Sequence, residues 1–184
     1  MNHLQSSSIV LTTALLGACV ELPEKVEPVQ GFDAQRYLGT WYEVARLDHS
    51  FERGLSNVTA HYGLRDDGGI KVINRGCNQE KGEWDEAEGK AYFVGDKDEG
   101  FLKVSFFGPF YGTYAVFELD QQDYQYSFVS GPDTDYLWLL SRTPEVSESV
   151  RADFLQQAAD RGFATEELIW VEQGKASCQA SQKS

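Results

Sequence analysis

Short apolar segments in which polar positions alternate recur along residues 32–142, and clusters of turn residues separate them. The segments are rich in aromatic and β-branched residues, as β-strands are. Eight strands are predicted, at Trp41–Asp48, Ser56–Arg65, Ile70–Cys77, Lys90–Val94, Phe101–Phe107, Thr113–Leu119, Tyr124–Val129 and Tyr136–Ser141. Glycine-containing turns such as 66–69 and 96–100 favour antiparallel pairing of neighbours. The fold class predicted is all-β, an eight-stranded antiparallel up-and-down barrel, because closure removes both exposed edges of such a sheet.

The hydrophobic period changes after Pro144, from that of strands to that of an amphipathic helix. Ser147 is a suitable N-cap, and Gly162 is suited to end the helix. The apolar face consists of Val150, Phe154, Leu155 and Ala158. We expect this C-terminal helix to pack on the barrel wall, followed by a short final strand at Leu168–Val171 and a polar tail.

An uncharged apolar stretch at residues 9–18 is too short to cross a hydrocarbon core, which needs about 20 helical residues. It is typical of a secretory signal, and residues 16–18 before Cys19 resemble a bacterial lipobox. We therefore expect a cleaved signal at 1–18, a lipidated Cys19 with a flexible or extended tether over 19–31, a barrel domain at 32–173 and a tail at 174–184. An ordinary secretory signal with an incidental cysteine is the alternative.

Charge and cysteine content narrow the classes of partner. The formal net charge of −13 argues against binding of nucleic acid and against electrostatic adsorption to anionic surfaces, so any membrane attachment is expected through the lipid anchor. With Cys19 assigned to lipid, Cys77 and Cys178 form an even pair in an oxidising compartment, which indicates a disulfide. The three histidines are scattered and no CxxC spacing is present, so we predict neither a metal site nor a cofactor.

A family resemblance rests on Gly39-Thr40-Trp41 at the start of the first predicted strand and Arg142 at the end of the eighth. This order of parts resembles that of the lipocalins, in which the tryptophan plugs the closed end of the barrel and the arginine packs over it. Three longer segments, at 36–43, 105–112 and 131–138, are similar to bacterial lipocalins related to apolipoprotein D. Those relatives are outer-membrane lipoproteins that bind fatty acids or lysophospholipids, some as homodimers, and are associated with envelope maintenance under stress. Lipocalins also often tether the C-terminal segment by a disulfide.

The resemblance implies a carrier that is anchored in the outer membrane, faces the periplasm, and stores or transports a single-chain lipid. If Arg142 covers the barrel floor, strand alternation places Leu140, Trp138 and Tyr136 on its inward face. Trp138 and Tyr136 then approach the open end, where Tyr111 of the glycine-rich turn lines the same region. Packing of these aromatic residues in the core or against the helix is the alternative.

Two other functions are considered. An enzyme acting in the barrel needs reactive side chains placed together. The acid–base pairs available are Glu43 with His61 and Asp48 with His49. Structural or exposed roles are favoured for both pairs. The sequence has no nucleophile elbow, phosphate loop or dinucleotide fingerprint, so we expect no catalytic residues. A scaffold that binds another envelope protein would have a dry barrel filled with side chains.

Overall fold

The computed structural model describes residues 20–174 and residue 178 of the 184-residue chain. The expected signal sequence and Cys19 lie outside the described residues. Within the described part, no helix is long and apolar enough to cross a membrane.

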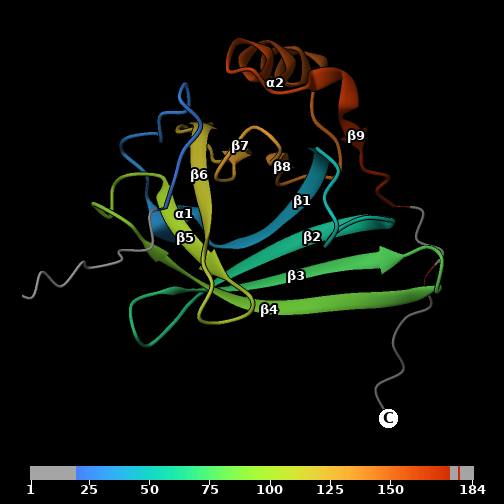
Figure 1. Cartoon of the computed structure of the whole chain (residues 1–184), viewed down its shortest axis with the longest axis horizontal. Helices are drawn as coiled ribbons and strands as arrows, with labels where there is room; N and C mark the ends of the chain where they lie inside the picture. Colours follow the sequence, from blue (N-terminus) through green and yellow to red (C-terminus); the bar gives the residue numbers. More distant parts are fainter. Residues whose placement is uncertain (1–19, 175–177, 179–184) are drawn as a thin grey trace, which may run out of the picture.

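Eight antiparallel strands form a closed barrel, as predicted (Figure 1). They are β1 (Gly39–Arg46), β2 (Leu55–Leu64), β3 (Ile70–Asn78), β4 (Glu83–Phe93), β5 (Phe101–Ser105), β6 (Gly112–Leu119), β7 (Tyr126–Ser130) and β8 (Leu137–Ser141). Each strand pairs with the next in sequence, and β1 closes the barrel by pairing with both β2 and β8.

The largest difference from the predicted strands is the start of β4, which begins at Glu83 and not at Lys90. Residues 83–88 are exposed or half-exposed and mostly polar, so hydrophobic alternation gave no strand signal there. Backbone pairing with β3, from Asn78↔Glu83 onward, extends the strand nevertheless. The β3–β4 hairpin therefore reaches further toward the open end of the barrel than hydropathy predicts.

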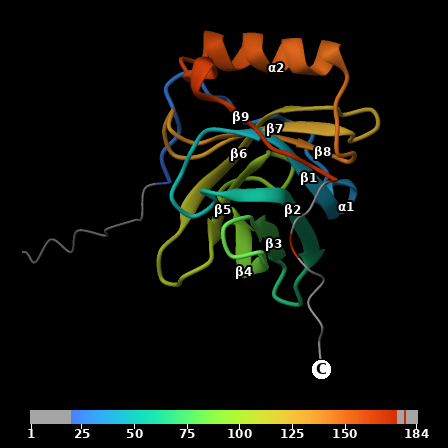
Figure 2. The ribbon, with the colours of Figure 1, turned by 90° about the vertical axis from the view of Figure 1, so that its right-hand side faces the viewer.

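The C-terminal helix α2 (Glu148–Asp160) begins where predicted, with the Ser147 side chain accepting a hydrogen bond from the Val150 amide. Phe154 and Ala158 are fully buried, and the Phe154 ring lies 5.0 Å from that of Phe128 on β7. Figures 1 and 2 both show α2 lying across one side of the barrel. The predicted packing of the helix on the barrel wall is thus confirmed.

Three shorter elements complete the fold. The one-turn helix α1 (Ala34–Tyr37), which was not predicted, precedes β1 at one end of the barrel. The 3-10 helix η1 (Thr165–Glu167) follows α2 and leads into β9 (Ile169–Trp170), which is shorter than the predicted final strand. β9 pairs with the end of β1, on the edge of β1 opposite β8.

Two hydrophobic clusters lie on opposite faces of the barrel wall. Strand alternation on β8 separates them, because Leu140 and Trp138 belong to the cluster inside the barrel whereas Leu137 and Leu139 belong to the cluster under α2. We call the end of the barrel that α1 covers the closed end. The opposite end, where β5 stops and β6 starts, is the open end.

The N-terminal segment packs along the outer wall from the open end to the closed end, and is not a free tether. The Glu21 carbonyl accepts a hydrogen bond from Thr113 Oγ1 at the start of β6 (2.7 Å). Further along, Val29 exchanges backbone hydrogen bonds with the wall, and Val26 is buried. Asp33 then reaches the closed end, where its amide donates to the Tyr124 hydroxyl (2.9 Å).

Several hydrogen bonds and a disulfide fasten the C-terminal segment to the barrel. Gln173 Nε2 donates to the backbone carbonyls of Glu43 on β1 (2.8 Å) and Val58 on β2 (3.0 Å). It therefore bridges these strands beyond Tyr42↔Thr59, their last paired residues. The predicted disulfide between Cys77 and Cys178 is present in the structure.

Candidate functional site

The closed end of the barrel is built around Trp41, which is fully buried. Its indole nitrogen donates to the Tyr37 carbonyl (2.8 Å), and the guanidinium carbon of Arg142 lies 3.9 Å from the centre of its ring. Arg142 also donates to the carbonyls of Thr40 and Arg36. The structure thus brings together the tryptophan and arginine that the sequence motifs singled out, and their contacts close the barrel floor.

Gly39 is required at this floor by its backbone. Its φ of +95° lies in a region that side chains disfavour, and a Cβ at this position would meet Arg142 Nη1 at 3.4 Å. The glycine lets the chain turn from α1 into β1 directly under the arginine.

A layer of tyrosines fills the barrel above the floor. The Tyr114 hydroxyl lies 2.8 Å from that of Tyr37 and 2.9 Å from that of Tyr62, and Tyr37 also contacts Ser127 Oγ (3.0 Å). Burial raises the pKa of Tyr37 to about 12, and raises the pKa values of Tyr62 and Tyr114 well above their usual range. All three are therefore neutral at physiological pH, and a void of only about 20 Å³ lies beside them.

A cavity of about 550 Å³ occupies the open half of the barrel. Val104 lines both this cavity and the small void, so it marks the boundary between the open and filled halves. Apolar and aromatic side chains dominate the lining, which includes Phe51, Leu55, Val58, Ala87, Val104, Phe106, Phe107, Phe110, Tyr111, Tyr136 and Trp138. This volume is within the range of about 300–1,000 Å³ that ligand pockets commonly have.

Three of the four residues expected to contact a ligand lie at this cavity. Tyr111, Tyr136 and Trp138 line it, and they come from the β5–β6 loop, the turn before β8 and β8 itself. Leu140 faces the barrel interior as expected but does not line the cavity. It is 4% exposed and packed in the inner cluster, because the half of the barrel around it is filled with side chains.

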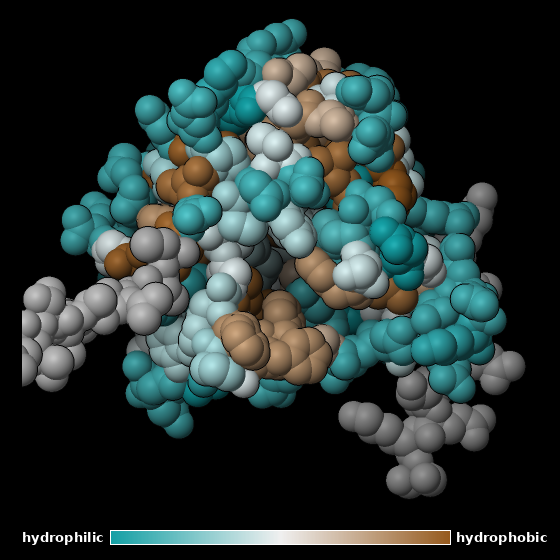
Figure 3. All heavy atoms as spheres, viewed as in Figure 1, coloured by the Kyte–Doolittle hydropathy of each residue, from teal (hydrophilic) through white to brown (hydrophobic). Residues whose placement is uncertain are grey.

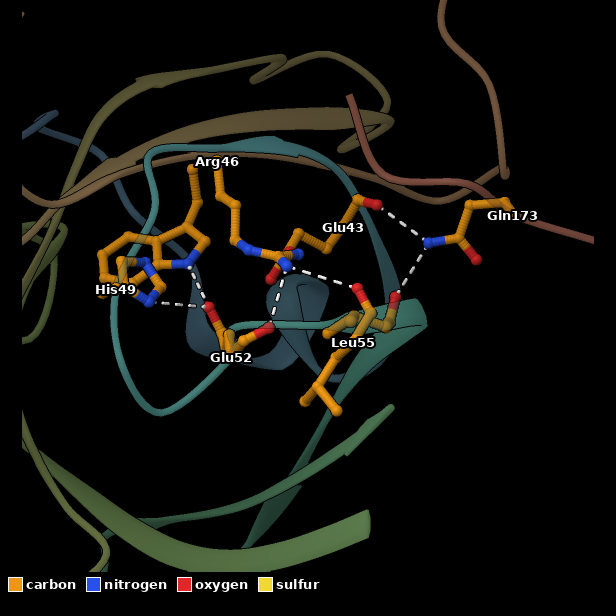
Figure 4. A network of polar contacts seen from close by, with 8 residues as sticks. Glu43, Arg46, His49, Glu52, Leu55 and Gln173 are labelled. Atoms are coloured by element: carbon orange, nitrogen blue, oxygen red, sulfur yellow. Dashed lines mark hydrogen bonds and ion pairs between the residues drawn. The ribbon is translucent and has the colours of Figure 1, made fainter. Parts of the chain in front are cut away.

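One wall of the cavity conceals a charged network formed by β1 and the β1–β2 loop (Figure 4). Arg46 Nη1 pairs with Glu43 Oε1 (2.6 Å), and Arg46 Nη2 donates to the backbone carbonyls of Glu52 and Leu55. Glu43, Arg46 and Glu52 are each less than 10% exposed. The arginine therefore ties the loop back onto β1 and fixes its position at the open end.

Burial and neighbouring charges shift the acidic groups of this network. Burial raises the pKa of the Glu43 carboxyl well above its usual range, and the neighbouring Glu52 carboxyl raises it further. Burial likewise raises the pKa of Glu52. Glu52 Oε2 accepts a hydrogen bond from the indole nitrogen of Trp138 (3.1 Å), which leaves the Trp138 ring available for apolar contacts in the cavity.

His49 is held in an aromatic stack beside this network. Its ring centre lies 4.3 Å from that of Phe51, 5.6 Å from that of Tyr136 and 4.9 Å from that of Trp138. His49 Nδ1 is 3.3 Å from Glu52 Oε2. Burial and the positive charge of Arg46 lower the pKa of His49 to about 4, so the ring is neutral at physiological pH.

Neither acid–base pair considered from the sequence is assembled. His61 contacts Thr40 Oγ1 (3.0 Å) rather than Glu43, and Asp48 pairs with Arg53 (2.7 Å) rather than with His49. In the part of the chain that the structure describes, no cluster of three or more His, Cys, Asp or Glu residues could hold a metal ion. The cavity thus presents aromatic surface, backed by a fixed polar network.

Comparison with known proteins gives one consistent family. Residues 32–173 match the model of the lipocalin-like domain. The chain is 61% identical over 165 residues to outer membrane lipoprotein Blc of Vibrio cholerae, covering 90% of this chain and 96% of that protein. It is 33% identical over 137 residues to apolipoprotein D of Rattus norvegicus, covering 70% and 68%.

A solved structure also shares the fold. Insecticyanin from the tobacco hornworm Manduca sexta superposes with a TM-score of 0.70 at 20% identity, covering 88% of this chain and 91% of that one. Together with the sequence relatives, it places the barrel and its C-terminal helix within a known fold.

Proposed function

The chain belongs to the lipocalin family, and from this premise we propose that it is a carrier whose open cavity binds one fatty acid or lysophospholipid. The observation that carries the proposal is the division of the barrel into a filled closed half and an empty, mainly apolar open half. Moving an acyl chain from water into such a space contributes roughly 0.8 kcal/mol per methylene, so affinity does not require many polar contacts.

The shape of the cavity favours a ligand with one acyl chain over one with two. The tyrosine layer blocks the barrel below Val104, and an eight-stranded barrel is only wide enough for one small ligand. The acyl chain then lies beside Trp138 and Tyr136, and the polar headgroup stays at the open end near water. Leu140 is no longer proposed as a contact, because it lies in the filled half.

The protein is an outer-membrane lipoprotein like its relative from Vibrio cholerae. We propose that Cys19 carries the lipid, that the domain faces the periplasm, and that storage or transport of lipids serves envelope maintenance under stress. Association of two chains is implied by the family resemblance alone and stays a prediction.

Two observations favour binding over the other functions considered. His49, which stacks against the cavity-lining Tyr136 and Trp138, is neutral and packed against Glu52, which suits a structural role rather than proton transfer to a ligand. A scaffold without ligand would have a filled barrel, whereas this barrel holds about 550 Å³ of open space.

Tryptophan emission tests the proposal. A lysophospholipid added to the protein is expected to change the emission and, at a hundredfold excess over Kd, to stabilise the fold by about 2.7 kcal/mol. Trp138→Ala should weaken binding, whereas Trp84→Ala should not, because Trp84 lies outside the cavity and stacks against Arg75. Saturating lipid that changes neither the emission nor the melting temperature of the parent protein would refute the carrier function.

A further inference from the structure

We propose that the open end of the barrel docks onto the phospholipid bilayer that holds the anchor, through an aromatic tip formed by Phe107 and Phe110. This inference rests on the proposed lipidation of Cys19 in the preceding section. Beyond the anchor, docking at the open end defines which face of the molecule meets the membrane and how the ligand reaches the cavity.

The aromatic tip is the most exposed apolar surface among the described residues. Phe107 and Phe110 are 81% and 79% exposed, and both lie in the loop that joins β5 to β6. The loop, residues 106–111, contains no charged residue. Figure 3 shows a pale-brown patch at the lower edge of the molecule, where this loop lies in Figure 1. Exposed aromatic residues of this kind suit the interface between headgroups and acyl chains.

The N-terminal segment starts at the same end of the barrel. The Glu21 carbonyl is fixed to Thr113, which is the second residue of β6 and lines the cavity. Only one residue, Val20, separates Cys19 from Glu21, so an anchored cysteine can be no further than about 7 Å from Glu21, the reach of an extended chain. Figure 2 shows the first described residues, in blue, on the same side as the yellow-green β5–β6 loop and opposite α1.

These two features favour the bilayer over a second copy of the chain as the occupant of the tip. A lipid on Cys19 holds the open end near the membrane surface, because the segment from Glu21 to Asp33 is already packed along the wall toward the closed end. The closed end cannot then face the same membrane. The net charge of −13 gives no attraction to an anionic surface, and Asp85 and Glu86 line the same cavity, so contact rests on the uncharged tip and its apolar burial. A cation does lie beside the loop, because Lys103 is 5.3 Å from the ring of Tyr111.

The cavity therefore opens toward the lipid surface. The mouth of the cavity is lined by Phe51, Phe107 and Phe110, and the same three side chains are exposed to solvent. Apolar surface is therefore continuous from the tip to the interior. A single-chain lipid can pass between the bilayer and the barrel without exposing its acyl chain to water, which avoids the cost of hydrating each methylene.

Quenching of a tryptophan by brominated lipid tests the orientation. The lipidated full-length mature protein is reconstituted into vesicles of phosphatidylethanolamine and phosphatidylglycerol that carry bromine on the acyl chains. Phe110→Trp places a probe at the tip, and Leu64→Trp places a matched probe at the closed end, where Leu64 is 57% exposed. The signal of the parent protein in the same vesicles is subtracted from each.

The probe at position 110 is expected to show blue-shifted emission and loss of intensity in brominated vesicles, while the probe at position 64 keeps its intensity and stays open to aqueous iodide. Equal quenching at both positions, or quenching at neither, would overturn the proposal. Shielding of position 110 from both lipid and iodide, in a chain that behaves as a dimer, would instead show that a second copy covers the tip. Failure of the parent to bind dispersed lysophospholipid, with position 110 still quenched, would refute the carrier function and leave the docking intact.

Discussion

Trp41 and Arg142 show how much of the closed end depends on two side chains. The indole ring fills the barrel floor, and the guanidinium group covers it while donating to the carbonyls of Thr40 and Arg36. Trp41→Ala is expected to lower the free energy of unfolding by about 3–5 kcal/mol, as truncation of a large buried aromatic residue does. Urea denaturation measures this loss. A variant that kept its unfolding midpoint but lost ligand binding would show that Trp41 belongs to the binding site and not to the floor.

His49 gives the stability a dependence on pH. Its pKa is about 4 in the folded protein and about 6.5 when unfolded, so between these values the unfolded chain binds a proton that the folded chain does not. The contribution of His49 is therefore present above about pH 6.5 and is lost as the pH falls toward 4, by up to about 3 kcal/mol.

His49→Phe retains an aromatic ring in the stack and removes this titration. The parent protein should lose stability relative to the variant as the pH is lowered from 6.5 to 4, measured by urea unfolding at each pH. A difference in stability between the two proteins that does not vary with pH would contradict the depressed pKa of His49. The raised pKa values of Glu43 and Glu52 make the free energy of unfolding rise as the pH falls, opposite to the effect of His49. Both proteins contain these two residues, so comparing the proteins removes most of their effect.

Residues in local motifs could be predicted from sequence, whereas the buried charges could not. Gly39 and Trp41 lie at the start of the first predicted strand, so the sequence motif was sufficient to place them at the barrel floor. Glu43, Arg46 and Glu52 are buried because the β1–β2 loop folds back over β1, a contact that charge content alone does not indicate. One signal was available: Glu43 lies two residues after Trp41 in β1, so strand alternation places both on the inward face.

Among the elements, strands with a buried face were predicted correctly, whereas the part of a strand with no buried face was missed. β8 alternates between two hydrophobic clusters, so its boundaries differ little from those predicted. The first half of β4 is held by its backbone pairing with β3 and carries little hydrophobic pattern. α1 is too short to show a helical period, and tertiary contacts at the barrel floor decide its structure.

The disulfide joins the C-terminal segment to the extended β3–β4 hairpin. Cys77 and Cys178 are separated by 101 residues, and a loop of that length contributes up to about 4–5 kcal/mol in the chain-entropy model. Replacement of both cysteines with serine should therefore lower the free energy of unfolding by several kcal/mol, measured under non-reducing conditions. A stability equal to that of the parent protein would show that the cross-link does not constrain the unfolded chain appreciably.

In the whole molecule, the proposed lipid anchor holds the open barrel at the membrane. Cys19→Ser is expected to release the protein from membranes or to leave the precursor uncut, which fractionation and peptide mass analysis detect. The lipid anchor would be ruled out if Cys19→Ser stayed in the membrane fraction to the same extent as the parent, and if the Cys19 peptide of the parent carried no modification.

If one single-chain lipid occupies the open half of the barrel, a variant that fills this space with a side chain should no longer bind it. Gly112 lines the cavity, and a Cβ there would have no neighbour within 4 Å, so Gly112→Phe can occupy the space without disturbing the wall. Gly63→Phe is the matched control, because Gly63 also has open space around it but lies near the closed end. Native mass spectrometry with added lysophospholipid should show one lipid bound per chain in the parent and in Gly63→Phe, and little in Gly112→Phe. Equal occupancy in all three proteins, or none in the parent, would contradict the account.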